Sequence, residues 1–328
     1  MTAPIDIGVR RVNGDDRPAV LALLADSLGW DRDATFAEFF EWKHSQNPFG
    51  ASPAWVALDG DDVIGFRTFL RWEFEHPDGR VRRAVRAVDT ATSPAYQGRG
   101  IFRALTMRAV EELAAEGVDF VFNTPNDKSR PGYLRMGWST VGRLPIVARV
   151  GGVGSALRMR ASRVPAERWP VATTAGAAAP DLLADERIET LLGAIGPATG
   201  LRTARTPAYL RWRYGLTALG YRAIAIDDDP TAGIAIFRVR RRGEATEAGI
   251  SDVLVPRADP AATRRLLARV ARETRADYAI RLGRPMLRGG YLPFPRQGPI
   301  LTWRPLADPA AAPPLADLDL SLGDVELL

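Results

Sequence analysis

Ser93-Pro-Ala-Tyr-Gln-Gly-Arg-Gly-Ile-Phe-Arg103 joins a strand-like run, Val85–Thr92, to a helix-like run, Phe102–Glu116. Its centre, Gln97-Gly-Arg-Gly100, contains two glycines, which let the backbone curl closely around a ligand. The helix that follows directs its unpaired N–H groups and its partial positive charge back at this loop. A strand, a glycine loop and a helix N-terminus in this order predict a phosphate-binding site.

The composition is that of a soluble globular protein. The chain has 328 residues, enough for two domains, with 46% hydrophobic and 25% charged side chains. No run approaches the roughly 18 apolar residues needed to cross a bilayer. The N-terminus lacks the basic flank and apolar core of an export signal. We therefore expect a cytoplasmic protein that makes no membrane contact.

Cysteine is absent, and histidine occurs only at His44 and His76. The first fact excludes disulfides, thiolate metal ligands and a cysteine nucleophile. Two histidines are too few for a histidine-rich metal site, so we expect both to be structural and expect no metal.

Basic residues are concentrated in the second half of the chain. Residues 1–150 hold 19 basic and 20 acidic side chains, whereas residues 151–328 hold 25 and 19. One arginine cluster precedes a turn at Gly243: Arg238, Arg240, Arg241 and Arg242. Because runs of charge are usually exposed, we interpret this cluster as a solvated hairpin tip and expect no nucleic-acid partner.

The order of predicted elements is repeated. In the first half, two helices precede three strands, at Ala54–Leu58, Val63–Phe74 and Arg80–Thr92, and the glycine loop follows. Phe39-Phe-Glu-Trp-Lys-His44 matches Tyr209-Leu-Arg-Trp-Arg-Tyr214 in the second half. These matches predict two copies of one α/β unit, with both tryptophans in the cores.

The glycine loop is the part that does not repeat. No glycine lies between Pro256 and the helix predicted at Ala261–Thr274, so this backbone cannot wrap a pyrophosphate in the same way. We expect one cofactor site, in residues 1–150, whose last strand or hairpin would be Trp138–Val150. Residues 151–200 would be a linker and the start of the second repeat, residues 201–306 a degenerate domain, and residues 307–328 a tail.

Two motifs together resemble the GCN5-related N-acetyltransferase (GNAT) superfamily. Gln97-Gly-Arg-Gly100-Ile-Phe102 matches its signature Gln/Arg-x-x-Gly-x-Gly/Ala except at Phe102. Asn126, Tyr133 and Gly137-Trp138 follow at the spacing typical of the family. The resemblance implies two tandem GNAT-like domains, each a mixed, mostly antiparallel sheet flanked by helices. The tandem layout is similar to that of mycothiol synthase and of aminoglycoside acetyltransferases with an added domain.

The resemblance also implies acetyl-CoA as the acyl donor. Its pyrophosphate would be bound by the loop residues Gln97, Gly98, Arg99, Gly100, Ile101 and Phe102. Its pantetheine arm would bind the backbone where one strand ends and splays from the next, at Thr90, Ala91 and Thr92. A backbone N–H there would polarise the thioester carbonyl. Asn126 would contact the cofactor or, alternatively, cap the short helix after it.

Without a cysteine, we expect the acceptor amine to attack the thioester directly, in a ternary complex. Tyr133 is the candidate general acid for the departing thiolate, with a packing tyrosine as the alternative. Candidates for the general base are Asp89 and Glu73, although a salt bridge would also explain either one. A base from the second half of the chain or the carboxylate of Leu328 are further alternatives.

The sequence therefore predicts an acetyl-CoA-dependent N-acetyltransferase that acts on a primary amine of a small molecule. It leaves the oligomeric state open, a homodimer included. One alternative is a non-catalytic module that senses CoA or another ligand. A second is an aminoacyl-tRNA-dependent transferase of the same fold, which the basic second half favours and the glycine loop disfavours.

Overall fold

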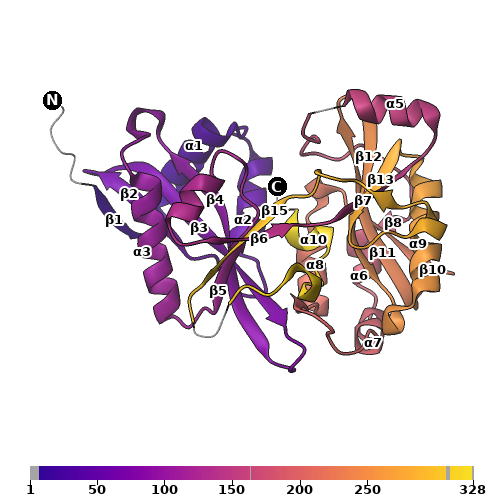
Figure 1. The fold of residues 1–328 in the computed structure, drawn as a ribbon. Helices are drawn as coiled ribbons and strands as arrows, with labels where there is room; N and C mark the ends of the chain where they lie inside the picture. Colours follow the sequence, from indigo (N-terminus) through magenta and orange to yellow (C-terminus); the bar gives the residue numbers. More distant parts are fainter. Residues whose placement is uncertain (1–6, 163, 308–310, 327–328) are drawn as a thin grey trace. The chain divides into compact units, whose positions relative to one another are not determined.

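The computed structural model describes residues 7–162, 164–307 and 311–326. The chain forms two compact units (Figure 1). The first consists of Met1–Phe74, Val81–Gly142 and Ile300–Pro314; the second consists of Glu75–Arg80, Arg143–Pro299 and Leu315–Leu328. In the described parts of the chain, no helix is both long enough and apolar enough to cross a membrane.

The first unit contains the elements predicted around the glycine loop. Its strands are β1 (Gly8–Arg11), β2 (Ala54–Asp59), β3 (Asp62–Glu75), β4 (Val81–Thr92), β5 (Phe120–Asn123), β6 (Ser139–Arg143) and β15 (Ile300–Pro305). Its helices are α1 (Arg17–Leu28), α2 (Ala34–His44), α3 (Ile101–Ala115) and α4 (Arg130–Arg135), with short 3₁₀ turns at Gly14–Asp16 and Pro94–Tyr96. The strand order is β1-β2-β3-β4-β5-β15-β6, with β4 and β5 parallel.

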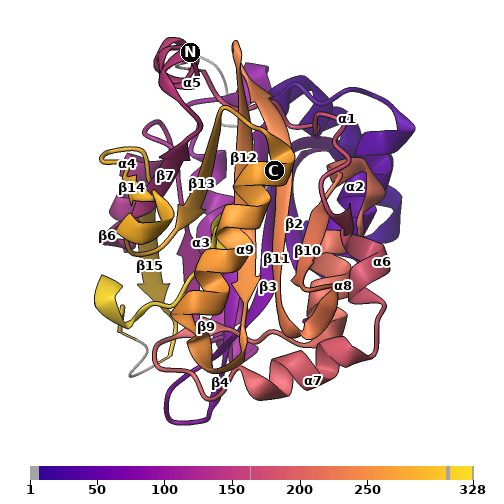
Figure 2. The same cartoon turned by 90° about the vertical axis from the view of Figure 1, so that its right-hand side faces the viewer.

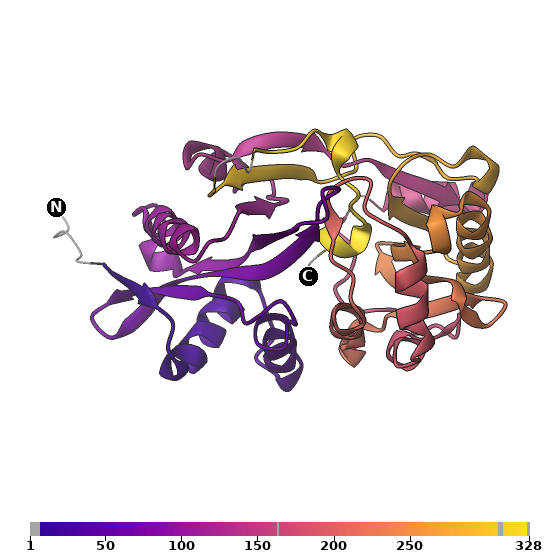
Figure 3. The same ribbon diagram turned by 90° about the horizontal axis from the view of Figure 1, so that it is seen from below.

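Helices cover both faces of the first sheet (Figure 3). The apolar side of α3, from Ile101 to Leu113, packs with Trp55 and Val85 in one core. On the other face α1 contacts β4, and Phe40 of α2 packs against Phe66 with ring centroids 6.3 Å apart. This layering leaves the N-terminus of α3 at the edge of the core, where the glycine loop enters.

In each sheet, one strand comes from a part of the chain that the sequence assigned to the other domain. β7 (Ile146–Val150) pairs with β13 (Tyr278–Leu282) and β14 (Leu292–Pro293) in the second sheet, so its assignment to the first half was wrong. β15 instead pairs with β5, and Trp303 stacks on Phe120 with ring centroids 3.7 Å apart (Figure 1). The predicted boundaries at 150 and 306 fail because strand pairing at this sequence separation has no local signal.

The second unit holds the remaining elements. Its strands are β7, β8 (Ala177–Ala178), β9 (Arg202–Thr203), β10 (Arg222–Ile226), β11 (Asp229–Arg242), β12 (Ala245–Leu254), β13 (Tyr278–Leu282) and β14 (Leu292–Pro293). Its helices are α5 (Val153–Ala161), α6 (Ala179–Leu183), α7 (Arg187–Ala194), α8 (Pro207–Gly215), α9 (Pro260–Thr274) and α10 (Leu322–Val325). Short 3₁₀ turns occur at Thr217–Leu219, Pro256–Ala258, Leu287–Gly289 and Leu315–Asp317.

The second sheet has the order β14-β7-β13-β12-β11-β10-β8, and α9 lies across one of its faces (Figure 2). The predicted linker, residues 151–200, contains α5, α6 and α7 and belongs to this unit. The predicted tail also differs from its assignment, because α10 packs against β12.

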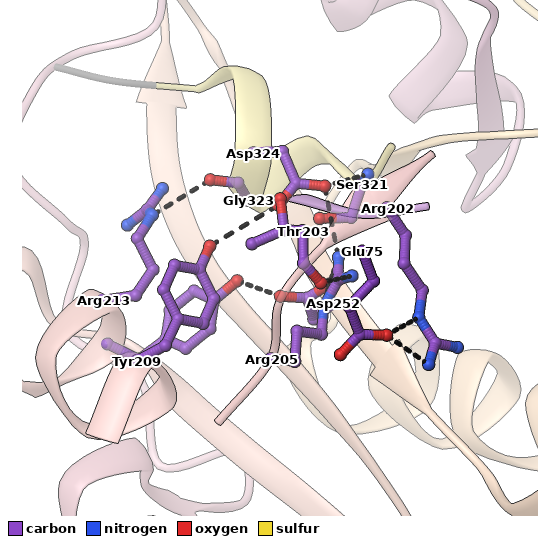
Figure 4. A network of polar contacts seen from close by, with 11 residues as sticks. Glu75, Arg202, Thr203, Arg205, Tyr209, Arg213, Asp252, Ser321, Gly323 and Asp324 are labelled. Atoms are coloured by element: carbon purple, nitrogen blue, oxygen red, sulfur yellow. Dashed lines mark hydrogen bonds and ion pairs between the residues drawn. The ribbon is translucent and has the colours of Figure 1, made fainter. Parts of the chain in front are cut away.

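A contact inside each unit repeats along with the sequence motif. Ala84 is the first residue of β4 that pairs with β5, and Glu247 is the first residue of β12 that pairs with β13; both pairings are parallel. An aspartate follows five residues after each of them. In the first unit, Asp89 bonds His44, the last residue of the repeated aromatic motif. Its counterpart Asp252, which Figure 4 labels, bonds Tyr214, the last residue of the second motif. The repeated motif thus anchors α2 and α8 to equivalent strands, and its tryptophans are buried as predicted.

Candidate active site

The glycine loop borders a cavity of about 790 Å³. Gly98 and Gly100 have φ values of +76° and +81°, the left-handed region that favours glycine. No atom lies within 4 Å of a Cβ built on either residue, so the loop backbone faces open space. The residues around the cavity are Thr92, Tyr96, Gln97, Gly98, Gly100, Ile101, Phe102, Arg103, Gly132, Arg135 and Met136.

The cavity suits an anion. Arg103 and Arg135 line it together with the first residues of α3, and no acidic side chain is part of its wall. The free N–H groups and the dipole of a helix start add to this positive potential. Arg99, which the sequence placed at the pyrophosphate, lies over the ring of Tyr96, with 5.2 Å between its guanidinium carbon and the ring centroid. Its contact with a pyrophosphate stays a prediction.

The two parallel strands diverge as the sequence predicted. β4 pairs with β5 only from Ala84 to Arg86, opposite residues 120–122. Beyond this point the two strands separate, and the segment Thr90–Thr92 has no pairing with β5. Backbone groups along such an opening are available to an extended ligand. Thr90 and Ala91 do not border the glycine-loop cavity, so any contact they make with a cofactor stays a prediction.

Tyr133 is buried and lies edge-on to two aromatic rings. Its ring centroid is 5.4 Å from that of Phe102 and 5.2 Å from that of Trp138. Its hydroxyl oxygen accepts a hydrogen bond from Nη2 of Arg67, at 2.7 Å. A guanidinium has only donors, so the hydroxyl proton of Tyr133 is not used in this bond. No other hydrogen bond of this hydroxyl is present within the described segments, and its proton is free to be donated.

Arg67 is a functional candidate that the sequence did not reveal. It lies on β3 and is fully buried. Its Nη1 donates to Oγ1 of Thr90, and its Nη2 donates to the Tyr133 hydroxyl. Its guanidinium carbon is 4.6 Å from the ring centroid of Phe69 and 5.4 Å from that of Phe102. Among the residues the structure describes, no carboxylate forms an ion pair with it. The only available signal was a charged residue in the middle of a buried strand.

Phe102 replaces the small residue that the family has at the end of the motif. Its ring lies edge-on to that of Tyr133, and a Cβ on Gly132 of α4 would be 3.2 Å from Phe102 Cε1. Phe102 also lines the glycine-loop cavity. The larger side chain therefore packs beside Tyr133 and leaves the loop backbone open.

Asp89 points away from Tyr133. Its Oδ2 is 2.8 Å from Nζ of Lys43 and 2.8 Å from Nε2 of His44, both on α2. Burial alone would raise the pKa of Asp89, but Lys43 and His44 hold it well below its ordinary value. The next residue, Thr90, faces the opposite side of β4, toward Arg67. Asp89 is thus an ion-paired anion on the α2 side of the sheet, the salt bridge that the sequence offered as an alternative.

His44 is also part of this ion-paired cluster. Burial lowers its pKa despite the opposing effect of Asp89, so the ring is neutral near pH 7. With Nε2 donating to Asp89, its Nδ1 carries the free lone pair. Nδ1 is buried and has no hydrogen-bond partner. The expectation of a structural histidine fits this contact.

Glu73, the other base candidate on a strand, is not brought to Tyr133. It lies six residues beyond Arg67 on β3, about 20 Å along the strand at its usual rise. Leu328 lies outside the described residues, so a base there or elsewhere in the second half of the chain stays a prediction. Of the candidates that the structure describes, neither Asp89 nor Glu73 lies beside the candidate acid.

Asn126 fixes the entry to α4. Its Oδ1 accepts hydrogen bonds from the backbone N–H of Lys128 at 3.1 Å and of Ser129 at 2.9 Å, and from the Ser129 hydroxyl at 3.0 Å. This is the capping alternative considered from the sequence. Asn126 does not line the glycine-loop cavity, and its effect on Tyr133 is to hold the helix that carries it.

In its described residues, the second unit has neither the glycine loop nor a tyrosine with an unused hydroxyl proton at the position of Tyr133. Instead of glycines, Arg257 and Ala258 have positive φ values, of 51° and 52°, after β12. Tyr291, the sequence counterpart of Tyr133, donates its hydroxyl proton to the carbonyl oxygen of Leu267, at 3.5 Å. Its proton is already used inside the fold. No group of three or more acidic or histidine side chains suited to a metal occurs in the part of the chain that the structure describes.

Comparison with known proteins agrees with this geometry. A family model described as an acetyltransferase (GNAT) domain matches residues 8–141. No curated protein matches the chain.

Solved structures share the fold over nearly the whole chain. One is a conserved protein of unknown function from Enterococcus faecalis V583, a probable N-acyltransferase, at 12% identity and a TM-score of 0.63, covering 92% of this chain and 73% of that chain. A GCN5-related N-acetyltransferase from Kribbella flavida has 17% identity and a TM-score of 0.63, with 94% and 74% covered. Eis1 from Mycobacterium abscessus has 16% identity and a TM-score of 0.57, with 92% and 73% covered. At these identities the likeness shows the fold alone.

Proposed function

Residues 8–141 match the family model of a GNAT acetyltransferase domain, and on this premise we propose that the chain transfers an acetyl group from acetyl-CoA to a primary amine of a small molecule. This match supports acyl transfer in general; the donor and the acceptor are our proposal. The observation that carries it is the glycine loop at the start of α3, open to a cavity lined by Arg103 and Arg135. A pyrophosphate is the ligand that such a loop and helix start bind best.

In the proposed reaction the amine nitrogen forms a bond to the thioester carbonyl carbon, and the carbon–sulfur bond breaks. Tyr133 gives its hydroxyl proton to the departing sulfur, which leaves as the thiol. Arg67 holds the phenol oxygen and stabilises the negative charge that develops on it during this transfer. The proton that the amine loses returns to Tyr133 through solvent. The products are an amide and free CoA, and the chain has no cysteine to carry a thioester-linked acyl-enzyme.

Initial-rate kinetics test the proposal. Thiol release would be followed over a panel of small primary amines, with acetyl-CoA and the best amine varied together. We expect double-reciprocal lines that intersect, as direct transfer in a ternary complex requires. Parallel lines would indicate an acyl-enzyme and contradict the mechanism. Binding of acetyl-CoA without thiol release for any amine would favour a sensing module over an enzyme.

A further inference from the structure

A cavity of about 1030 Å³ lies within the second unit, on the sheet face opposite α9. The core beneath α9 contains Val147, Val239, Ala248 and Ala279. Their strand neighbours face the other way and line the cavity: Ile146, Arg240, Glu247, Tyr278 and Ile280. The cavity is separate from the glycine loop, which belongs to the first unit.

Helix α5 contributes to the cavity wall without packing a core. Ala156, Met159 and Arg160 line the cavity, yet none of the nine residues of α5 is buried. Leu157, on the same helix, is 66% exposed. The rest of the wall is largely apolar, from Ile146, Ile280, Phe294, Leu322 and Val325. A helix that spans a hollow in this way forgoes the dispersion contacts that a packed helix makes.

One end of the cavity is charged and buried. Glu247 is 3.1 Å from Nη2 of Arg240 and 3.0 Å from Nε of Arg242, and it accepts a hydrogen bond from Tyr278 at 2.9 Å. Arg240 also pairs with Glu326. The prediction of a solvated hairpin tip was therefore wrong for Arg240, and for Arg238, because both are buried against these carboxylates.

Two polar atoms at this end are unsatisfied. Nε of Arg240 is a buried donor and Oε2 of Glu326 a buried acceptor, and neither has a hydrogen-bond partner among the residues that the structure describes. Leaving such groups unpaired costs about 1–3 kcal/mol each. A ligand with an acceptor atom at this position would satisfy Nε of Arg240, as the few convergent polar groups of small-molecule sites do.

The charge balance of the wall favours an anion. Among the described residues of the wall, the cations are Arg160, Arg240 and Arg242 and the anions are Glu247 and Glu326, which leaves one positive charge in excess. Arg160 forms no ion pair with a described residue and lies on α5, at the edge of the cavity. A negatively charged ligand group between Arg160 and Arg240 would balance this excess.

We propose that this cavity binds a monocarboxylate with an apolar chain. The carboxylate lies at Arg160 and at Nε of Arg240, and the chain lies on Met159, Ile280 and Phe294. Burial of the chain provides the binding energy, because apolar area is removed from water. The site is independent of acyl transfer in the first unit.

Octanoate is the probe, and calorimetry of the full chain is the measurement. We expect one octanoate to bind, and 1-octanol to bind more weakly because it lacks the charge. Ala156→Trp fills the cavity and abolishes binding, whereas Leu157→Trp on the exposed side of the same helix leaves it unchanged. Arg160→Gln weakens binding about threefold to fivefold, the value of one exposed ion pair. Arg264→Gln, an equal charge loss on α9, has no effect.

Other outcomes overturn the proposal. They are no heat with octanoate, equal binding by Ala156→Trp and the unchanged protein, or equal losses in Arg160→Gln and Arg264→Gln. The variant Gly100→Trp separates this site from the proposed function, because it blocks the glycine loop and still binds octanoate. If it lost octanoate binding, the fatty chain would be occupying the acyl-donor site instead.

Discussion

Replacing Arg67 by methionine should slow acyl transfer without weakening cofactor binding. Arg67 donates to the Tyr133 oxygen at 2.7 Å and does not line the glycine-loop cavity. Methionine has a similar length, but it has no donor and no charge. The phenol oxygen would then develop negative charge next to an apolar side chain when Tyr133 releases its proton.

The magnitude follows from this one contact. A hydrogen bond to a charged group contributes about 1.5–3 kcal/mol, and here its strength grows as charge develops on the oxygen. At about 1.4 kcal/mol for each factor of ten, kcat should fall about 10-fold to 100-fold. The free energy of unfolding should change little or rise. No carboxylate among the described residues forms an ion pair with Arg67, so the substitution leaves no buried anion without its counter-charge.

Thiol release from acetyl-CoA is the assay, with the best amine of the panel and with acetyl-CoA affinity measured in parallel. Arg71→Met is the matched control, because Arg71 lies on the same strand and pairs with Glu116 at 2.9 Å, away from Tyr133. A double-mutant cycle with Tyr133→Phe isolates the coupling. Once Tyr133 has lost its hydroxyl, Arg67→Met should have no further effect on kcat.

Two results would refute this reasoning. One is an unchanged kcat in Arg67→Met at full folding. The other is an equal loss from Arg67→Met in the presence and in the absence of the Tyr133 hydroxyl, because Arg67 would then act on something other than Tyr133.

Two further predictions concern stability. Asp89→Asn leaves the buried Lys43 without its carboxylate and should lower the free energy of unfolding by about 3–5 kcal/mol in urea titrations; a stable variant that has lost only kcat would restore Asp89 as a candidate base. In the second unit, hydrogen bonds led by that from Arg158 lower the pKa of Asp277 to about 2. This carboxylate therefore contributes about 2 kcal/mol above pH 4, which is lost as the pH falls from 4 toward 2, and Asp277→Asn should remove that pH dependence from the unfolding free energy.

The parts of the site that could be predicted are those whose signal is local. The glycine loop lies between one strand and one helix, so a few residues specify its conformation and its chemistry. Tyr133 lies in a short motif with its own spacing. The divergence of β4 from β5 follows from the predicted fold and is present in the registers.

The remaining parts depend on contacts between distant residues. Arg67 meets Tyr133 across 66 positions of the chain, and nothing in either local sequence indicates the pair. Strand alternation predicts that Asp89 and Thr90 face opposite sides, but the ion pairs of Asp89 with Lys43 and His44 join residues at least 45 positions apart. The pairing of β15 with β5 spans about half the chain, and the charges that bury Arg238 come from the C-terminal segment at Glu326. Each of these requires the tertiary structure.

The central claim, that the first unit binds acetyl-CoA through its glycine loop, is tested most directly by calorimetric titration with acetyl-CoA. Gly100 and Gly79 have nearly equal φ values, +81° and +80°, and a Cβ on either meets no atom within 4 Å. Tryptophan therefore strains both backbones equally but fills the cavity only at Gly100. We predict one site in the unchanged protein and in Gly79→Trp, and none in Gly100→Trp. Equal heats for all three proteins would contradict the account.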